Sequence, residues 1–278
     1  MEYVEVGNAC IPALGFGTFE LDSQDAYRMV RHALETGYRH IDTAQMYGNE
    51  AAVGRAVRDT AVDRDEVFLT TKVWMDRFHD GDLQRSVEES LERLGLDAAD
   101  LVLLHWPNTE VPLAETIHAL LDARERGLMH HAGVSNFPSA LMRAATDIAG
   151  PGQLVNNQVE YHPYLRQDAV LDAARMLGMS VSAYCPLARG QVFGDPVLQR
   201  IGREHGKNEG QVTLRWLLDQ EVIAIPRTRT EAHADANLDA FDFTLSEDER
   251  ATVDRELLGA ERLIDPSFAP AWDRVQPA

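Results

Sequence analysis

The chain has 278 residues, of which 45% are hydrophobic and 26% charged, a composition typical of a folded globular protein with a sizeable core. Its formal charge is −19, and its basic residues are nearly all arginine, with Lys72 and Lys207 as the two lysines. So acidic a surface repels polyanions, which argues against nucleic acid and anionic lipid as partners.

The N-terminal sequence lacks the basic and apolar regions of a secretory signal, and no run of about 18 apolar residues occurs, so we predict a cytoplasmic protein without a membrane partner. Cys10 and Cys185 lack C-x-x-C spacing and are expected to be reduced thiols. No histidine has metal-ligand spacing, so we predict no metal site and expect His130-His131 in a solvated turn before a strand.

The acidic, lysine-poor composition also raises the hypothesis of a halophilic host. Repulsion between like charges on such a surface is costly in dilute buffer and is screened at high salt. An ordinary acidic protein from an arginine-favouring genome is the alternative explanation.

Short β-branched or apolar runs alternate with longer amphipathic stretches along the chain. The amphipathic stretch 82–94, for example, places Leu83, Val87 and Leu91 on one face and so predicts a helix. Strand–helix alternation implies parallel strands, and the number of units matches a closed (β/α)8 barrel, the TIM barrel. The predicted strands are residues 14–19, 39–44, 67–73, 101–106, 132–136, 155–161, 181–185 and 222–226.

The two ends of the chain depart from this pattern. Gly7-Asn8 between alternating residues predicts an N-terminal β-hairpin that caps the bottom of the barrel. Residues 265–278 contain three prolines and no periodicity, so we predict a C-terminal loop over the barrel mouth. No linker-like segment divides the chain, and we expect one domain over residues 1–278.

Familiar dinucleotide-binding signatures do not fit. The segment that begins at Gly15 resembles the start of G-x-G-x-x-G, but Glu20 replaces the third glycine and would place a carboxylate near a pyrophosphate. Positions 68 and 203 are Phe and Arg, so neither lysine forms a Tyr-x-x-x-Lys pair. A zinc alcohol dehydrogenase would need more cysteines than the chain contains.

Four polar residues are predicted at or just beyond the C-terminal ends of strands, where a barrel places its active site. Asp42 ends the second strand, Tyr47 follows it, Lys72 closes the third strand and His105 closes the fourth. A carbonyl that accepts hydride needs a proton donor, which Tyr47 would be. Lys72, held by Asp42, would lower the pKa of Tyr47. His105 would hydrogen-bond the carbonyl oxygen.

The motifs around these residues resemble the aldo-keto reductase family, and the resemblance covers nearly the whole chain. It implies a barrel that binds extended NADP(H) without a Rossmann fold, transfers the 4-pro-R hydride and uses all four residues as a catalytic tetrad. It also implies a monomer. The matching stretches are Leu14-Gly-Phe-Gly-Thr, Gly37-Tyr-Arg-His-Ile-Asp-Thr-Ala-Gln-Met-Tyr-Gly-Asn-Glu, Thr71-Lys-Val-Trp, Leu103-Leu-His-Trp-Pro, Gly133-Val-Ser-Asn-Phe and Asn157-Gln-Val-Glu-Tyr-His-Pro.

By the same resemblance, Ser135, Asn136 and Gln158 would bind the nicotinamide carboxamide, and Tyr184 would stack on the ring. The segment from Leu187 to Gln191 would approach the pyrophosphate. The remaining expected cofactor contacts are Gly17, Thr18, Pro186, Arg189, Arg227, Thr228, His233 and Asn237.

The adenosine-phosphate segment departs from the family pattern. Arg227 and Thr228 keep a cation and a hydroxyl, but His233 stands where the family has an arginine, and Ala236 where it has a glutamate. An imidazole is mostly neutral at pH 7, so binding of the 2′-phosphate should weaken. We therefore predict NADP(H) as cofactor, with NAD(H) also accepted.

Aromatic residues Phe19, Trp74, Trp106 and Trp272 are predicted to wall a substrate pocket for compact aldehydes, ketoaldehydes and keto acids or esters. The expected partner is a small carbonyl compound. The resemblance is to the prokaryotic branch, where diketogluconate and methylglyoxal are typical substrates. A cofactor-binding regulatory subunit with little turnover, or an inactive relative, are the alternatives.

Overall fold

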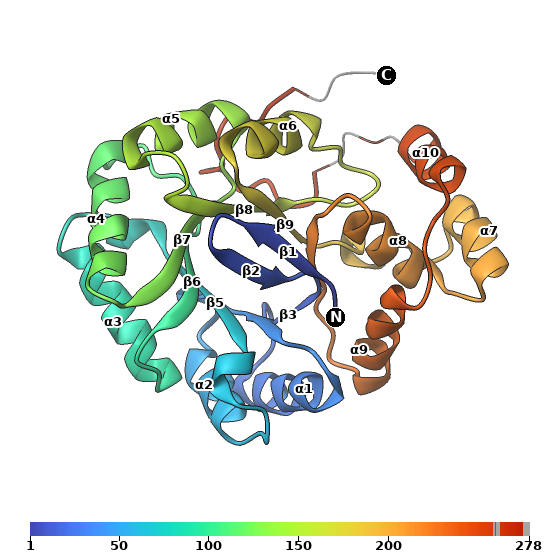
Figure 1. Ribbon diagram of the computed structural model, residues 1–278, viewed down its shortest axis with the longest axis horizontal. Helices are drawn as coiled ribbons and strands as arrows, with labels where there is room; N and C mark the ends of the chain where they lie inside the picture. Colours follow the sequence, from blue (N-terminus) through green and yellow to red (C-terminus); the bar gives the residue numbers. More distant parts are fainter. Residues whose placement is uncertain (258, 260–261, 275–278) are drawn as a thin grey trace.

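Eight parallel strands form a barrel in the computed structural model, which describes residues 1–257, 259 and 262–274 (Figure 1). Each strand pairs with the next one along the chain. The strands are β3 (Gly15–Gly17), β4 (His40–Asp42), β5 (Phe68–Val73), β6 (Ala99–Leu104), β7 (Met129–Ser135), β8 (Leu154–Glu160), β9 (Ser180–Tyr184) and β10 (Ile223–Ile225).

The barrel closes where β10 returns to β3. Leu14 and Ala224 form a parallel bridge, and the Ala224 amide donates to the Ala13 carbonyl at 2.8 Å. The Gly17 amide donates to the Pro226 carbonyl at 2.9 Å. The predicted (β/α)8 TIM barrel is thereby confirmed.

Helices surround the strands as the amphipathic stretches predict. Helix α3 buries Leu83, Val87, Leu91 and Leu94 against the barrel and ends at Gly95, whose φ of +66° suits glycine. The helices are α1 (Ser23–Thr36), α2 (Glu50–Arg58), α3 (Asp82–Leu94), α4 (Leu113–Glu125), α5 (Ser139–Ala149), α6 (Asp168–Leu177), α7 (Pro196–His205), α8 (Glu209–Leu218), α9 (Glu231–Leu238) and α10 (Glu247–Glu256).

The N-terminal hairpin closes one end of the barrel. Strands β1 (Tyr3–Val6) and β2 (Ala9–Pro12) pair antiparallel across the turn at Gly7 and lie over the barrel's centre in Figure 1. Ile11 is fully buried in an apolar cluster with Leu101, Leu103 and Ile223 from the strands. The predicted cap is confirmed, and the opposite end, where the strands finish, is left for the site.

The expected turn at His130-His131 is wrong, because both residues belong to β7. His131 pairs with Leu101 in the neighbouring strand, and its ring stacks on Phe68 with centroids 6.3 Å apart. Partial exposure of the first residues of this strand gives them a polar pattern that resembles a loop. Across the described ranges, no helix combines the length and apolar character needed to cross a bilayer.

Candidate active site

A cavity of about 910 Å³ opens at the C-terminal ends of the strands. Most of the residues that the sequence assigns to catalysis or binding line it. They are Gly17, Phe19, Asp42, Tyr47, His105, Trp106, Ser135, Asn136, Gln158, Tyr184, Pro186, Leu187, Arg189, Arg227, Thr228, His233 and Asn237.

Two expected cofactor contacts lie outside the cavity. Thr18 is fully buried and donates its hydroxyl to the Asp42 carbonyl at 3.1 Å, so it braces the strand end. Gln191 is exposed at the end of a short helix, and its carbonyl accepts the Tyr164 hydroxyl at 3.4 Å. Both predictions followed motif position, which does not specify the direction of a side chain.

Two expected pocket walls, Trp74 and Trp272, stand behind other aromatic rings. The Trp74 ring packs edge-on against His105 at 5.2 Å and Phe268 at 5.8 Å between centroids. Trp272 packs on Trp106 at 6.0 Å. Phe268 itself lines the cavity, so the two tryptophans support its wall rather than form it.

Asp42 and Lys72 form a buried ion pair at the ends of adjacent strands. The Lys72 ammonium donates to Asp42 Oδ1 at 2.6 Å and to the Thr43 carbonyl at 3.0 Å. It also lies 3.4 Å from the Tyr47 hydroxyl oxygen. Both charged side chains are nearly inaccessible to solvent, with 1% and 4% exposed. Burial lowers the pKa of Lys72, and the Asp42 carboxylate opposes that shift.

Tyr47 projects from the loop that follows β4. Burial raises the pKa of its phenol well above the ordinary value near 10, and the charge of Asp42 acts in the same direction. The sequence predicted a lowered pKa for Tyr47, whereas the net shift in the structure is upward. The main physical reason is the burial of the phenol, and the charge of Asp42, whose carboxylate pairs with the Lys72 ammonium at 2.6 Å, adds to it. The phenol therefore stays protonated through neutral pH.

His105 completes the group, with its ring centroid 5.7 Å from that of Tyr47. Burial, with a smaller contribution from Lys72, lowers its pKa well below the ordinary imidazole value. The ring is consequently neutral at pH 7 and carries one N–H. Its Nδ1 atom is buried and has no hydrogen-bond partner among the described residues.

Stability is expected to fall as the pH drops below about 6.5, because the pKa values of buried His40 and His105 lie below that of an exposed imidazole. The unfolded chain then binds protons that the folded chain does not, which favours unfolding. Urea midpoints at about pH 7.5 and about pH 5.5 would measure the loss. A His40→Asn variant should show a smaller difference between the two pH values; an equal or larger difference would contradict the linkage.

An amide cluster lies beside Asp42, Lys72 and His105, at the ends of β7, β8 and β9. Asn136 has φ +63°, a conformation that asparagine tolerates, and its side chain donates to the His105 carbonyl at 3.0 Å. Its Oδ1 accepts the Tyr184 hydroxyl at 2.8 Å. Ser135 donates to the Gln158 carbonyl at 2.7 Å. These bonds orient carboxamide and hydroxyl groups toward the cavity.

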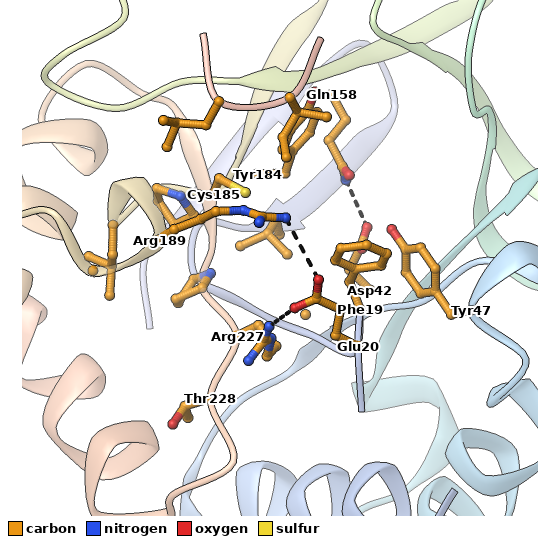
Figure 2. A pocket seen from close by; sticks show the side chains of 18 of the residues that line it. Phe19, Glu20, Asp42, Tyr47, Gln158, Tyr184, Cys185, Arg189, Arg227 and Thr228 are labelled. Atoms are coloured by element: carbon orange, nitrogen blue, oxygen red, sulfur yellow. Dashed lines mark hydrogen bonds and ion pairs between the residues drawn. The ribbon is translucent and has the colours of Figure 1, made fainter. Parts of the chain in front are cut away.

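Gln158 joins this amide cluster to the Asp42–Lys72 ion pair. Its Nε2 donates to Asp42 Oδ2 at 2.7 Å (Figure 2). The other oxygen of the same carboxylate, Oδ1, accepts a hydrogen bond from the Lys72 ammonium. Each oxygen of the Asp42 carboxylate is therefore occupied, which compensates its burial. Any change in the hydrogen bonding of Gln158 would therefore alter the environment of the Asp42–Lys72 ion pair.

The cations of the cavity are Arg189 and Arg227, which the loops after β9 and β10 supply. Helix α9 and the segment before it supply four of the lining residues: Arg227, Thr228, His233 and Asn237. Carboxamide partners, a tyrosine ring and guanidinium groups in one cavity are the groups that a nicotinamide dinucleotide requires. The residues present therefore fit that cofactor.

The C-terminal segment is bound across the cavity at two points. Buried Glu160 accepts the amides of Leu263 and Ile264 at 2.7 and 2.9 Å. Asp273 accepts the Ser139 amide and hydroxyl at the start of α5, each at 2.7 Å. These contacts place residues 263–268 at the mouth. Residues 275–278 of the predicted loop lie outside the described part.

Sequence reasoning missed several lining residues. Glu20 was noted only as an obstacle to a phosphate loop, and the tail from residue 265 was predicted to lie over the mouth, but only Trp272 of it was assigned to the pocket wall. The others are Met46, Cys185, Phe193, Asn208, Ile225, Pro226, Ala236, Leu263, Ile264, Asp265, Pro266 and Phe268. No group of three or more His, Cys, Asp or Glu side chains is placed to hold a metal within the described ranges.

Comparison with known proteins gives consistent matches. The model of the aldo/keto reductase family matches residues 13–257. Methylglyoxal reductase DkgB of Escherichia coli O157:H7 is 39% identical over 266 residues, which cover 95% of this chain and 99% of that protein. A solved structure provisionally named 2,5-diketo-D-gluconic acid reductase B is 46% identical, with a TM-score of 0.96 over 99% of this chain and 98% of that one. A Bombyx mori aldo-keto reductase solved in complex with NADP is 33% identical, with a TM-score of 0.87 over 95% of each chain.

Proposed function

The chain belongs to the aldo-keto reductase family and is an NAD(P)H-dependent oxidoreductase, and we propose that it reduces small aldehydes and ketones through Tyr47, Lys72, Asp42 and His105. The observation that carries this proposal is the Tyr47 hydroxyl, which lines the cavity beside the buried Lys72–Asp42 pair. A bound nicotinamide would supply hydride to the carbonyl carbon.

Tyr47 is the proposed proton donor to the substrate oxygen. Its pKa is raised by burial, so the O–H is present throughout the neutral range in which a donor is needed. Lys72, 3.4 Å from that oxygen, would stabilise negative charge as the proton leaves. Asp42 keeps the ammonium in position.

His105 is proposed to orient the carbonyl. Its pKa is lowered by burial, so it offers a hydrogen bond from a neutral ring without placing a second cation next to Lys72. Neutral His105 and protonated Tyr47 can then both donate to one substrate oxygen. Two donors to one oxygen would fix the orientation of the carbonyl in the cavity.

The shape of the mouth supports compact substrates. Phe19, Trp106 and Phe268 line the cavity, and the Phe19 ring lies 5.0 Å from that of Tyr47. Aromatic walls around a small polar centre favour short aldehydes, ketoaldehydes and keto acids. The relatives named as methylglyoxal and diketogluconic acid reductases support the same class, and we propose a dicarbonyl of few carbons as the substrate.

NADPH is the proposed cofactor, with NADH accepted at a modest disadvantage. His233 is exposed on α9 at the cavity edge, where an arginine would add a permanent charge for the 2′-phosphate. Arg227 lies at the same side. A preference for NADPH above about a thousandfold, roughly 4 kcal/mol, would contradict this inference.

Replacing His233 by arginine is expected to tighten NADPH binding by about tenfold and to change NADH binding by less than about twofold, because only NADPH carries the phosphate that the new guanidinium can pair. Fluorescence titration of each cofactor would measure the dissociation constants. A matched His79→Arg change, on the exposed segment before α3, should change neither. Equal tightening of both cofactors would argue against a role at the 2′-phosphate.

The proposal is tested by following absorbance at 340 nm with methylglyoxal and an aromatic aldehyde, using NADPH and NADH at low and high KCl. Turnover of either carbonyl would support a reductase. Cofactor binding without turnover of any carbonyl, in either salt, would favour a regulatory subunit instead.

A further inference from the structure

Glu20 lies between the two arginines of the cavity. Its Oε2 pairs with Arg227, and its Oε1 lies 3.7 Å from Arg189 (Figure 2). Arg229 also donates to the Glu20 main-chain carbonyl. Among the described residues that line the cavity, Arg189 and Arg227 are the arginines and the chain has no lysine there, and Glu20 contacts both.

The local backbone presents Glu20 to these partners. It follows β3 in the turn before α1 and has φ +59°, in the left-handed region that few glutamates occupy. Arg189 has φ +53° within the short segment Ala188–Gly190. Two residues in strained conformations from distant segments thus meet across the cavity.

A dinucleotide that enters this cavity needs the same guanidinium groups for its phosphates. Arginine pairs strongly with carboxylate and with phosphate alike, so Glu20 and the cofactor compete for one set of partners. The Glu20 side chain is 45% exposed, which leaves it room to swing into solvent when a phosphate replaces it. If it stayed, it would repel the phosphates.

We propose that Glu20 determines cofactor specificity: it holds Arg227 and Arg189 in internal ion pairs that the phosphates must displace, and it thereby lowers the preference for NADPH over NADH. This inference rests on the proposed binding of a nicotinamide dinucleotide in the cavity. Because NADPH has one phosphate more than NADH, the competition weakens the binding of NADPH more than that of NADH. This effect is separate from that of His233, where a cation for the 2′-phosphate is missing, and the two effects add.

The test compares Glu20→Gln with wild type in the full-length enzyme, by fluorescence titration of NADPH and NADH. Removing the charge should lower the dissociation constant of NADPH by about tenfold and that of NADH by about threefold or less. At about 1 M KCl, where exposed charges are screened over about 3 Å, the gain should shrink to about twofold.

Glu88→Gln is the matched control. Glu88, on α3, pairs with Arg126, just after the end of α4, and is 40% exposed. Its replacement changes the net charge by the same amount, and Glu88 does not line the cavity. Both dissociation constants should remain at the wild-type values. A general effect of net charge would appear in this variant too and would overturn the proposal.

A double-mutant cycle with Arg227→Gln identifies the partner. If Glu20 acts by holding Arg227, Glu20→Gln should gain little NADPH affinity once that arginine is absent. Unchanged cofactor constants in Glu20→Gln, or equal gains for NADPH and NADH, would overturn the inference while leaving the reductase proposal intact. Wild-type protein that binds neither cofactor would instead overturn the proposed function itself.

Discussion

Replacing Tyr47 by phenylalanine should lower kcat for methylglyoxal by about a thousandfold, within the range typical of the loss of a positioned general acid. The phenol oxygen lies 3.4 Å from the Lys72 ammonium, and phenylalanine keeps the ring against Phe19 and His105 while removing only the hydroxyl. Dissociation constants for NADPH should change by less than about threefold, because the loss falls on the transition state. Steady-state rates and fluorescence titrations on the same preparation measure both.

Tyr27→Phe is the matched control. Tyr27 lies on α1, and its hydroxyl donates to Asp59 at 2.7 Å at the outer surface of the barrel. The same chemical change there should leave kcat within about twofold of wild type. If Tyr47→Phe kept more than about a tenth of the activity, another group would have to deliver the proton.

The barrel and the floor of its site were predictable because of how such strands are buried. Each barrel strand is buried on both faces, by the barrel interior on one side and by helices on the other, so its sequence is a nearly continuous apolar run. Asp42, Lys72 and His105 then stand out at the ends of such runs, and the structure brings all three beside Tyr47. Strand order along the chain was enough to place them together.

Other features depend on contacts between segments far apart in the chain, which periodicity does not report. Glu160 holds the amides of Leu263 and Ile264 across more than 100 residues. Glu20 meets Arg227 in the same way, 207 residues away. The sequence suggested that Glu20 would disturb a phosphate site but not which arginines would pair with it.

The pKa of Tyr47 shows a second limit. Sequence reasoning placed a lysine near a tyrosine and expected a lowered pKa. The outcome depends on how deeply the phenol is buried and on which anion already compensates the ammonium. Those quantities are set by the packed barrel, and here burial, together with the charge of Asp42, raises the pKa of Tyr47.

Replacing Lys72 by methionine should destabilise the fold by about 3–5 kcal/mol and lower activity by at least about a hundredfold. The Asp42 carboxylate would remain buried with Gln158 as a partner but without its cation, the condition under which a buried charge is most costly. Methionine matches the length of the lysine stem, so lost packing contributes little. Urea unfolding measures the free energy, and the assay at 340 nm measures the activity.

The second lysine gives the control, and a double variant separates the charge from the shape. Lys207 lies 3.6 Å from exposed Asp242, so Lys207→Met should cost about 1 kcal/mol or less and leave kcat unchanged. Adding Asp42→Asn to Lys72→Met should recover part of the lost stability, because the unpaired charge is gone, but no activity. Strictly additive losses would mean that Asp42 and Lys72 do not depend on each other, and the positioning role proposed for Asp42 would fail.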